Sequence, residues 1–284
     1  IQDWDAMILF AYSHYDVEDN SGAINGWLDI KDNPVKRAQM GTASLLFLKG
    51  YIPPAAQRLT MNYTQDYTMY YGLLNPATAS FFSDAELPPS LLVDTIFRRD
   101  SFDADATTSI INAYTPEQLQ NIQTRRVSQS TDGQFVWDVS ASGAEHISID
   151  TPYLQSFAGF IAGTQQQAEN LTVSLGPDSN AAISLAALDG TELEVSDRML
   201  LTVCGKQKND GQRWFIGKFT WGSAPVHMQK LEGNIGVALA QPTSYTVYQL
   251  AGDGTLMPPL QTTVQDVKLQ FALDADTVWY EIVS

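Results

Sequence analysis

The second half of the chain is divided into short apolar runs by Gly, Asp, Asn and Pro residues. The runs cover residues 134–138, 146–150, 156–162, 170–175, 181–188, 199–203, 214–220, 245–250, 267–271 and 277–282. Runs of this length, rich in β-branched and aromatic residues and bounded by turn formers, indicate strands rather than helices. Their close spacing leaves room only for tight connections. We therefore predict that residues 127–284 form an antiparallel β-sandwich and that the protein is mainly β.

Two Asp-Gly pairs mark turns within this region. Asp189-Gly190 separates residues 183–188 from residues 192–195, and Asp253-Gly254 follows the run at 245–250. A two-residue hairpin turn needs positive φ at both central positions, which Asp and Gly tolerate. We expect residues 183–188 and 192–195 to pair across the first turn, and a second turn at 253–254.

The N-terminal segment has a different pattern. Ala6–Ala11 is a continuous apolar run, typical of a strand buried on both faces of a parallel sheet. A polar loop that carries Trp27 follows it. Asp32 or Asn33 can then cap a helix with Pro34 in its first turn, and Gly50 ends that helix after residues 35–49. These signals predict one strand, loop and helix unit.

Residues 51–126 form a connecting or accessory region of mixed structure. Residues 57–62 are predicted as a strand, and residues 87–97 are predicted as a helix after Pro88-Pro89. The rest of this region is rich in Tyr and irregular.

Composition excludes several functions. The 16 Lys and Arg against 32 Asp and Glu give a net charge of -16, which argues against binding to nucleic-acid phosphates. No run of 18 apolar residues exists, so no membrane span is expected. The single cysteine, Cys204, is predicted to be a small buried residue. His14, His146 and His227 lack the spacing of a metal site, and no phosphate-cradling loop is found, so we assign neither a metal nor a cofactor.

Several sequence blocks recur in an order that resembles a known family. They are Ser130-Thr-Asp-Gly-Gln-Phe-Val-Trp-Asp138, Ile149-Asp-Thr-Pro-Tyr-Leu-Gln155, the residues 184–190, Ser196-Asp-Arg-Met-Leu-Leu-Thr-Val-Cys-Gly-Lys206 and Val278-Trp-Tyr-Glu-Ile282. This order resembles the C-terminal β-domain of large microbial glycoside hydrolases whose catalytic domain is a (β/α)8 TIM barrel. Residues 2–13 look like the last barrel strand of such enzymes, and residues 26–36 look like its loop and the start of the final helix.

The resemblance implies three parts. Residues 1–50 would be the last strand, loop and helix of a TIM barrel, residues 51–126 the connecting region, and residues 127–284 the C-terminal antiparallel β-sandwich. It also implies cleavage of a poly- or oligosaccharide by two carboxylates. Similar enzymes carry these carboxylates on earlier barrel strands, so we assign no catalytic residue here. The remaining N-terminal barrel portion of the same protein is the expected partner, and an extracellular or periplasmic location is implied.

Active-site residues of TIM barrels project from the C-terminal ends of the strands. Tyr12, Ser13, His14 and Tyr15 follow the predicted last strand, and Trp27 lies in the next loop. Aromatic rings can stack on sugar rings, so we predict that these five residues bind the carbohydrate substrate. An equally good interpretation is that these residues only pack the loop against the barrel.

Two other functions remain open. One is a non-catalytic carbohydrate-binding module that stacks sugars on Trp137, Trp214, Trp221 or Trp279. The other is a structural or oligomerisation sandwich. Exposed aromatic rings would favour binding, whereas rings between the sheets would favour packing. Trp137 and Trp279 are predicted to be core residues, while Trp221 fits a loop and a buried position equally well.

Overall fold

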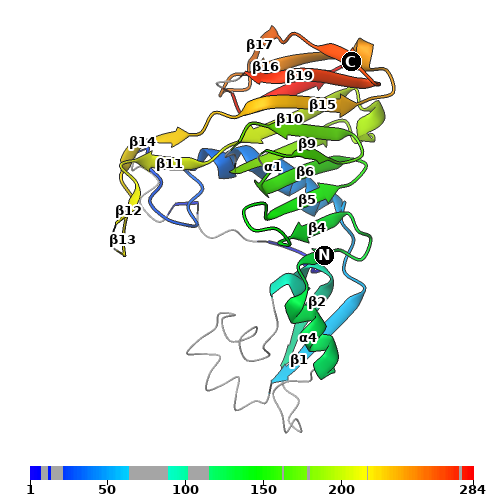
Figure 1. Ribbon diagram of the computed structural model, residues 1–284, viewed down its shortest axis with the longest axis vertical. Helices are drawn as coiled ribbons and strands as arrows, with labels where there is room; N and C mark the ends of the chain where they lie inside the picture. The colour runs from blue at the N-terminus through cyan, green and yellow to red at the C-terminus, as the bar shows by residue number, and fades with distance from the viewer. Residues whose placement is uncertain are drawn as a thin grey trace. The chain divides into compact units, whose positions relative to one another are not determined.

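The computed structural model describes residues 1–7, 12–13, 22–63, 89–101, 115–161, 163–177, 180–215, 217–274 and 277–284. The chain divides into two compact units (Figure 1). The first contains residues 1–5 and 52–140, and the second contains residues 6–51 and 141–284. The division into three parts that the resemblance implies stays a prediction.

The first unit combines short strands with two helical segments. Its elements are β1 (Gln57–Tyr63), the 3-10 helix η1 (Pro89–Val93), β2 (Thr95–Ser101), α4 (Pro116–Thr124), β3 (Val127–Gln129) and β4 (Phe135–Asp138). Strand β1 pairs in parallel with β2, and β3 pairs with β4 in the antiparallel sense. The strand predicted at residues 57–62 is thus confirmed as β1.

The helix predicted over residues 87–97 is wrong. Residues 89–93 make only the short 3-10 helix η1, and the chain enters β2 at Thr95. The side-chain amide of Gln2 donates to the carbonyls of Leu92 and Thr95, at 2.8 and 2.7 Å. A continuing α-helix would need the Leu92 carbonyl for its own ladder. A tertiary hydrogen bond and the β-branched pair Thr95-Ile96 therefore override the Pro-Pro helix signal.

The second unit holds most of the strands. Its elements are α1 (Pro34–Lys49), β5 (His146–Asp150), β6 (Leu154–Phe160), β7 (Gln165–Gln167), β8 (Leu171–Leu175), β9 (Asn180–Ala187), η2 (Leu193–Val195), β10 (Arg198–Cys204), β11 (Gln207–Asp210), β12 (Arg213–Phe215), β13 (Lys218–Thr220), β14 (Ser223–Met228), β15 (Glu232–Ala238), η3 (Pro242–Ser244), β16 (Thr246–Leu250), β17 (Leu256–Pro259), β18 (Thr263–Gln265), β19 (Lys268–Asp274) and β20 (Trp279–Val283).

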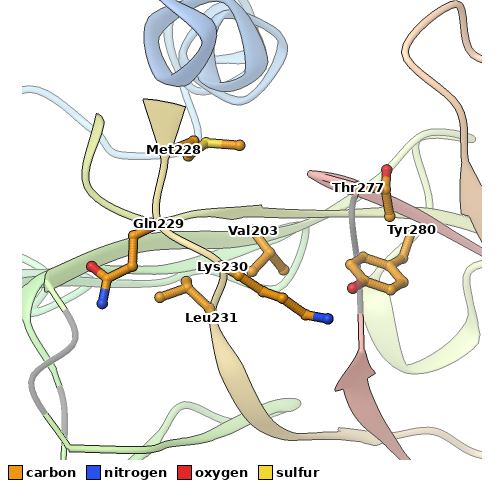
Figure 2. A pocket seen from close by; sticks show the side chains of 7 residues that line it. All are labelled: Val203, Met228, Gln229, Lys230, Leu231, Thr277 and Tyr280. Carbon is orange, nitrogen blue, oxygen red and sulfur yellow. The ribbon is translucent and has the colours of Figure 1, made fainter. Parts of the chain in front are cut away.

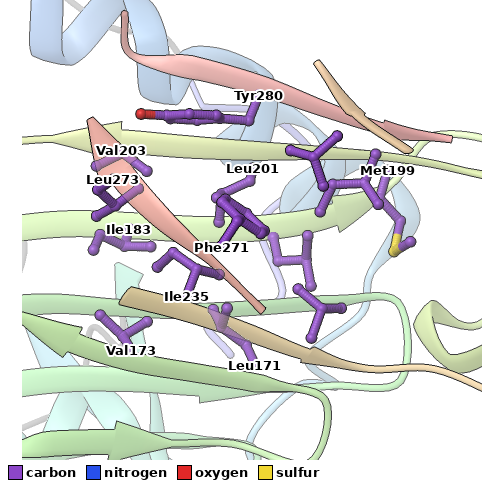
Figure 3. Packing of buried hydrophobic residues seen from close by; sticks show 14 of the residues in the cluster. Leu171, Val173, Ile183, Met199, Leu201, Val203, Ile235, Phe271, Leu273 and Tyr280 are labelled. Atoms are coloured by element: carbon purple, nitrogen blue, oxygen red, sulfur yellow. The ribbon is translucent and has the colours of Figure 1, made fainter. Parts of the chain in front are cut away.

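Two antiparallel sheets of this unit face each other. In one sheet the strands of the unit follow the order β17-β16-β20-β10-β9-β6-β5, and the five-stranded second sheet has the order β18-β19-β15-β8-β7. Their inner faces share one hydrophobic core, in which Ile183 and Leu201 of the first sheet pack with Ile235 and Phe271 of the second (Figure 3). The protein is therefore mainly β with antiparallel sheets, as predicted.

Alternation along each strand builds this core. Ile183 and Leu185 of β9 point inward and are fully buried, at 0% exposure. Ser184 lies between them and points to the opposite face, because successive side chains of a strand alternate. It is nevertheless also fully buried, since α1 covers that face.

Helix α1 lies against β9 and β10 on the outer face of the larger sheet (Figure 1). Thr42 Oγ1 lies 2.8 Å from Ser184 Oγ, and the Gln39 amide donates to the Ala182 carbonyl at 3.0 Å. Asn33 caps the helix by accepting from the Lys36 N–H, and Gly50 ends it with φ 61°. The predicted helix is confirmed. Residues 8–11 of the predicted strand Ala6–Ala11 lie outside the described residues, so the barrel portion stays a prediction.

The Asp189-Gly190 turn is present, but its predicted second strand is wrong. Residues 192–195 contain the 3-10 helix η2, and β9 pairs instead with β10, with Ala187 opposite Met199. The Asp189 carboxylate accepts hydrogen bonds from Thr191, Ser196 and Asp197, which hold a longer loop. The second predicted turn is confirmed, because the Gly254 N–H donates to the Ala251 carbonyl between β16 and β17.

Candidate functional site

Four aromatic rings gather at one place in the second unit. Trp27 comes from the loop before α1, Trp214 from β12, Phe219 from β13 and Trp221 from the residues after β13. Ring centroids lie 4.7 Å apart for Trp27 and Trp221, and 4.8 Å apart for Trp27 and Phe219. Phe219 also lies 4.8 Å from Trp221 and 5.1 Å from Trp214. We call these four residues the aromatic cluster.

A hairpin presents most of the cluster. The run at residues 214–220, predicted as one strand, is two strands, β12 and β13, with Gly217 at φ 72° between them. Trp214 and Phe219 are cross-strand partners in this hairpin, a pairing that stabilises two-stranded ribbons. Strands β11 and β14 pair with each other and carry the hairpin between them (Figure 1).

Asn209 connects the hairpin to the loop that carries Trp27. Its side chain is completely buried and accepts from the Ile24 N–H at 2.8 Å. The same amide donates to the carbonyls of Ile24 and Trp221, at 2.7 and 2.9 Å. Gly222 permits the close approach that this needs, because a Cβ at this position would lie 2.0 Å from the Asp210 carbonyl oxygen. The backbones on both sides of the cluster are therefore held by one side chain.

The backbone at Trp27 is also tied to α1. Lys36 Nζ donates to the carbonyls of Trp27 and Asp29, at 2.5 and 3.3 Å. Asp29 itself is buried, and its N–H donates to the Gly26 carbonyl. The loop backbone that carries Trp27 is thus tethered to the first turn of a helix.

The rings are nevertheless open to solvent. Trp27 is 64% exposed and Trp214 is 68% exposed, while Phe219 and Trp221 are half-buried. The neighbouring Phe215 is 63% exposed, with the Arg213 guanidinium 6.0 Å from its ring centroid. Contiguous exposed aromatic surface is uncommon on soluble proteins and marks binding sites. Flat rings with indole N–H donors at their edges suit a partner that has both apolar faces and polar groups.

The residues predicted to bind substrate have different positions. Trp27 lies in the aromatic cluster, and Tyr12 is exposed, with its carbonyl accepting from the N–H groups of Ile30 and Lys31. Tyr12 is therefore joined through its backbone to the loop that carries Trp27. Ser13 is half-buried. His14 and Tyr15 lie outside the described residues.

The tryptophans considered for a carbohydrate-binding module also differ in position. Trp214 and Trp221 belong to the cluster. Trp137 and Trp279 lie outside it, and the prediction that they are core residues is wrong, because both are only half-buried. Phe219 was not foreseen. The aromatic residues on both sides of Gly217 were the sequence signal that could have identified the hairpin.

A cavity of about 230 Å³ lies beside the strand ends of the sandwich (Figure 2). Val203, Leu231 and Tyr280 line it with buried side chains, and Gln229 and Lys230 are exposed at its rim. Small-molecule sites have volumes of about 300–1,000 Å³, so this cavity is smaller than most of them. We assign it no role.

Ionisable groups give little indication of chemistry. Burial raises the pKa of Cys204 to about 11, which makes it an unreactive thiol and fits the predicted buried position. Among the described residues, no group of three His, Cys, Asp or Glu side chains is placed to hold a metal ion. Within the same residues, no helix is long and apolar enough to cross a membrane.

Comparison with known proteins yields no match to a family model, a curated protein or a solved structure. The functional argument therefore depends on the geometry of the aromatic cluster.

Proposed function

We propose that this chain binds carbohydrate through the aromatic cluster, as part of a glycoside hydrolase that acts on a poly- or oligosaccharide. The observation that carries the proposal is the exposure of Trp27 and Trp214 in a cluster whose neighbouring backbones, at Ile24 and Trp221, are joined by Asn209. Rings held in advance lose little conformational entropy when a ligand stacks on them.

The charge of the protein supports a sugar over the other common ligand of exposed aromatic rings. Bases of single-stranded nucleic acids also stack on such rings, but those sites lie in basic grooves that follow the phosphates. The net charge of -16 disfavours a phosphate backbone for the chain as a whole. A neutral sugar carries apolar C–H faces and hydroxyls without that penalty.

The hydrolase part of the proposal rests on the resemblance. Because the resemblance covers only the last strand, loop and helix of the barrel, both catalytic carboxylates are assigned to the preceding barrel strands. The β-domain then acts as the structural partner of the barrel, and an exported location suits an enzyme that degrades polysaccharides. The alternative is a carbohydrate-binding module without catalysis, which uses the same cluster. Sugar release by the polypeptide extended to include those strands would favour the hydrolase, and binding without release would favour the module.

Binding can be tested with Trp214→Ala and Trp27→Ala in affinity electrophoresis through gels that contain neutral xylan, β-glucan or galactomannan. Phe160→Ala is the matched control, because Phe160 is an exposed aromatic residue outside the cluster. We expect each Trp variant to weaken binding about tenfold, the equivalent of about 1.4 kcal/mol. Unchanged retardation of both Trp variants, or equal loss in the control, would overturn the proposal.

A further inference from the structure

The outer face of the five-stranded sheet contains a hollow of about 320 Å³. We call it the polar trough. Residues of its floor and walls include Gln165, Thr172, Ser174, Asn234, Gly236 and Gln270. They come from β7, β8, β15 and β19, and none of them belongs to the aromatic cluster. The volume lies at the lower end of the range for small-molecule sites, about 300–1,000 Å³.

The register of the sheet sets the trough at its centre. Gly236 of β15 lies opposite Thr172 on one side and Gln270 on the other. Asn234, two residues earlier on the same face, lies opposite Ser174. Side chains with amide or hydroxyl groups therefore surround a position that has no side chain.

Neither the backbone nor the packing requires glycine at position 236. Its φ lies outside the left-handed region, and a Cβ there would meet Thr172 Cβ at 3.5 Å, an ordinary contact. Gly233 in the same strand differs, because a Cβ there would lie 2.1 Å from the Ser174 carbonyl oxygen. Glycine inside a strand costs stability and often marks a place where a ligand approaches the backbone closely. Gly236 leaves the floor of the trough without a side chain of its own, and the Lys268 chain passes 3.7 Å from the place a Cβ would take.

A hairpin turn contributes one residue to the lining of the trough. Strands β18 and β19 are joined by Asp266 and Val267, with φ 51° and 55°. A two-residue hairpin turn requires positive φ at both positions, which is unfavourable for a β-branched residue such as Val267. The turn places Asp266 among the residues that line the trough.

The lining is neutral although the chain is strongly acidic. One cation, Lys268, and one anion, Asp266, face the trough, and Lys268 Nζ donates to Thr172 Oγ1 at 2.9 Å. The amides and hydroxyls offer both donors and acceptors, which matches the hydroxyl groups of sugars. We propose that the polar trough binds a neutral glycan chain, as a second carbohydrate site made of residues distinct from the aromatic cluster.

The trough can be tested without a contribution from the cluster. The full chain carrying Trp27→Ala and Trp214→Ala would be titrated calorimetrically with cellohexaose, xylohexaose and mannohexaose. Gly236→Ala and Gln165→Ala would then be added separately, with Gln167→Ala as matched control. Gln167 lies on the same strand and the same face as Gln165 but does not line the trough.

We expect at least one hexasaccharide to bind. Gln165→Ala should weaken its binding about fivefold, the equivalent of one lost hydrogen bond. Gly236→Ala should weaken it to a similar extent, because the added methyl group fills part of the floor of the trough. Gln167→Ala should leave binding unchanged. Gly236→Ala should also raise the melting temperature, since alanine suits a strand better than glycine. No binding of any hexasaccharide, or equal binding by the trough variants and the control, would overturn the proposal. Equally tight binding of hexagalacturonate would overturn the neutral class of ligand.

The two carbohydrate proposals fail separately. If the cluster binds no sugar, Trp214→Ala alone leaves binding intact while Gly236→Ala weakens it. If the trough binds no sugar, Gly236→Ala alone leaves binding intact while Trp214→Ala weakens it.

Discussion

The sandwich core and the aromatic cluster belong to the same unit but use hydrophobic residues in opposite ways. In the core, Leu201 and Ile235 are at most 1% exposed and are enclosed between two sheets. In the cluster, Trp27 and Trp214 leave most of their ring surface in water. Burial of such large rings would have stabilised the protein, so their exposure is not explained by stability.

Tryptophan usage extends this contrast to the whole chain. None of the six tryptophans is buried, and the core is built from aliphatic residues with a few Phe and Tyr rings. The largest apolar side chains are therefore absent from the place where they would contribute most to folding. This separation agrees with the proposal that the residues for binding differ from those that stabilise the fold.

The largest loss of stability is expected from a substitution in the core. Leu201→Ala removes a fully buried side chain from between the sheets, and we expect a loss of about 2–5 kcal/mol in the free energy of unfolding. Trp214→Ala, at an exposed site, should cost less than about 1 kcal/mol. Urea unfolding followed by circular dichroism measures both.

The effects of these two variants on sugar affinity should rank in the opposite order. Below the unfolding transition, Leu201→Ala should retain the carbohydrate affinity that Trp214→Ala loses. If the two variants lost stability equally, the cluster would have to be regarded as part of the core, and the contrast would fail.

A substitution at Asn209 should affect both the stability of the fold and the proposed sugar binding. Asn209→Ala leaves the Ile24 N–H and two carbonyls without their buried partner, at a cost of about 1–3 kcal/mol. It should also weaken sugar binding, because it releases the backbones that hold Trp27 and Trp221. Thermal unfolding and Trp fluorescence measure the two effects. Gln212→Ala is a milder control, since Gln212 Oε1 accepts one hydrogen bond, from the Asn209 N–H. A stable Asn209→Ala variant with full affinity would show that the cluster forms without this link.

Local pattern was sufficient to predict most strands of the sandwich. The run at 146–150 coincides with β5, and those at 181–188 and 199–203 agree with β9 and β10 within one residue at each end. Helix α1 was predicted from its cap residues Asn33 and Gly50. These signals are local, because strand alternation and helix caps depend on neighbouring residues.

The errors occurred where distant or side-chain contacts decide the structure. The cluster joins Trp27 to residues almost two hundred positions away, through a buried amide at Asn209 that no local pattern indicates. Sequence could therefore propose Trp27 as a sugar-binding residue, and separately Trp214 and Trp221, but not that they lie together. At Asp189, a side chain that accepts several hydrogen bonds produced a longer loop than the Asp-Gly pair predicts.

That loop gives the smallest predicted effect, which lies outside both the core and the cluster. Burial raises the pKa of Asp189, but hydrogen bonds from Thr191, Ser196 and Asp197 outweigh it and lower the pKa to about 2. An unfolded aspartate has a pKa of about 3.9. The carboxylate therefore stabilises the fold fully above about pH 4, and this contribution is lost as the pH falls through 2.

Because Asp189 is exposed, solvent screening limits the contribution to about 1 kcal/mol. Asp189→Asn should remove it, so that the variant is less stable than the parent at pH 7 and the difference shrinks as the pH is lowered toward 2. Urea midpoints measured across this range test the expectation. A difference that stays constant with pH would assign the effect to lost loop geometry rather than to charge. Sugar binding at neutral pH should be unaffected, since Asp189 lies in neither the aromatic cluster nor the polar trough, and a change there would show that the η2 loop is coupled to one of these sites.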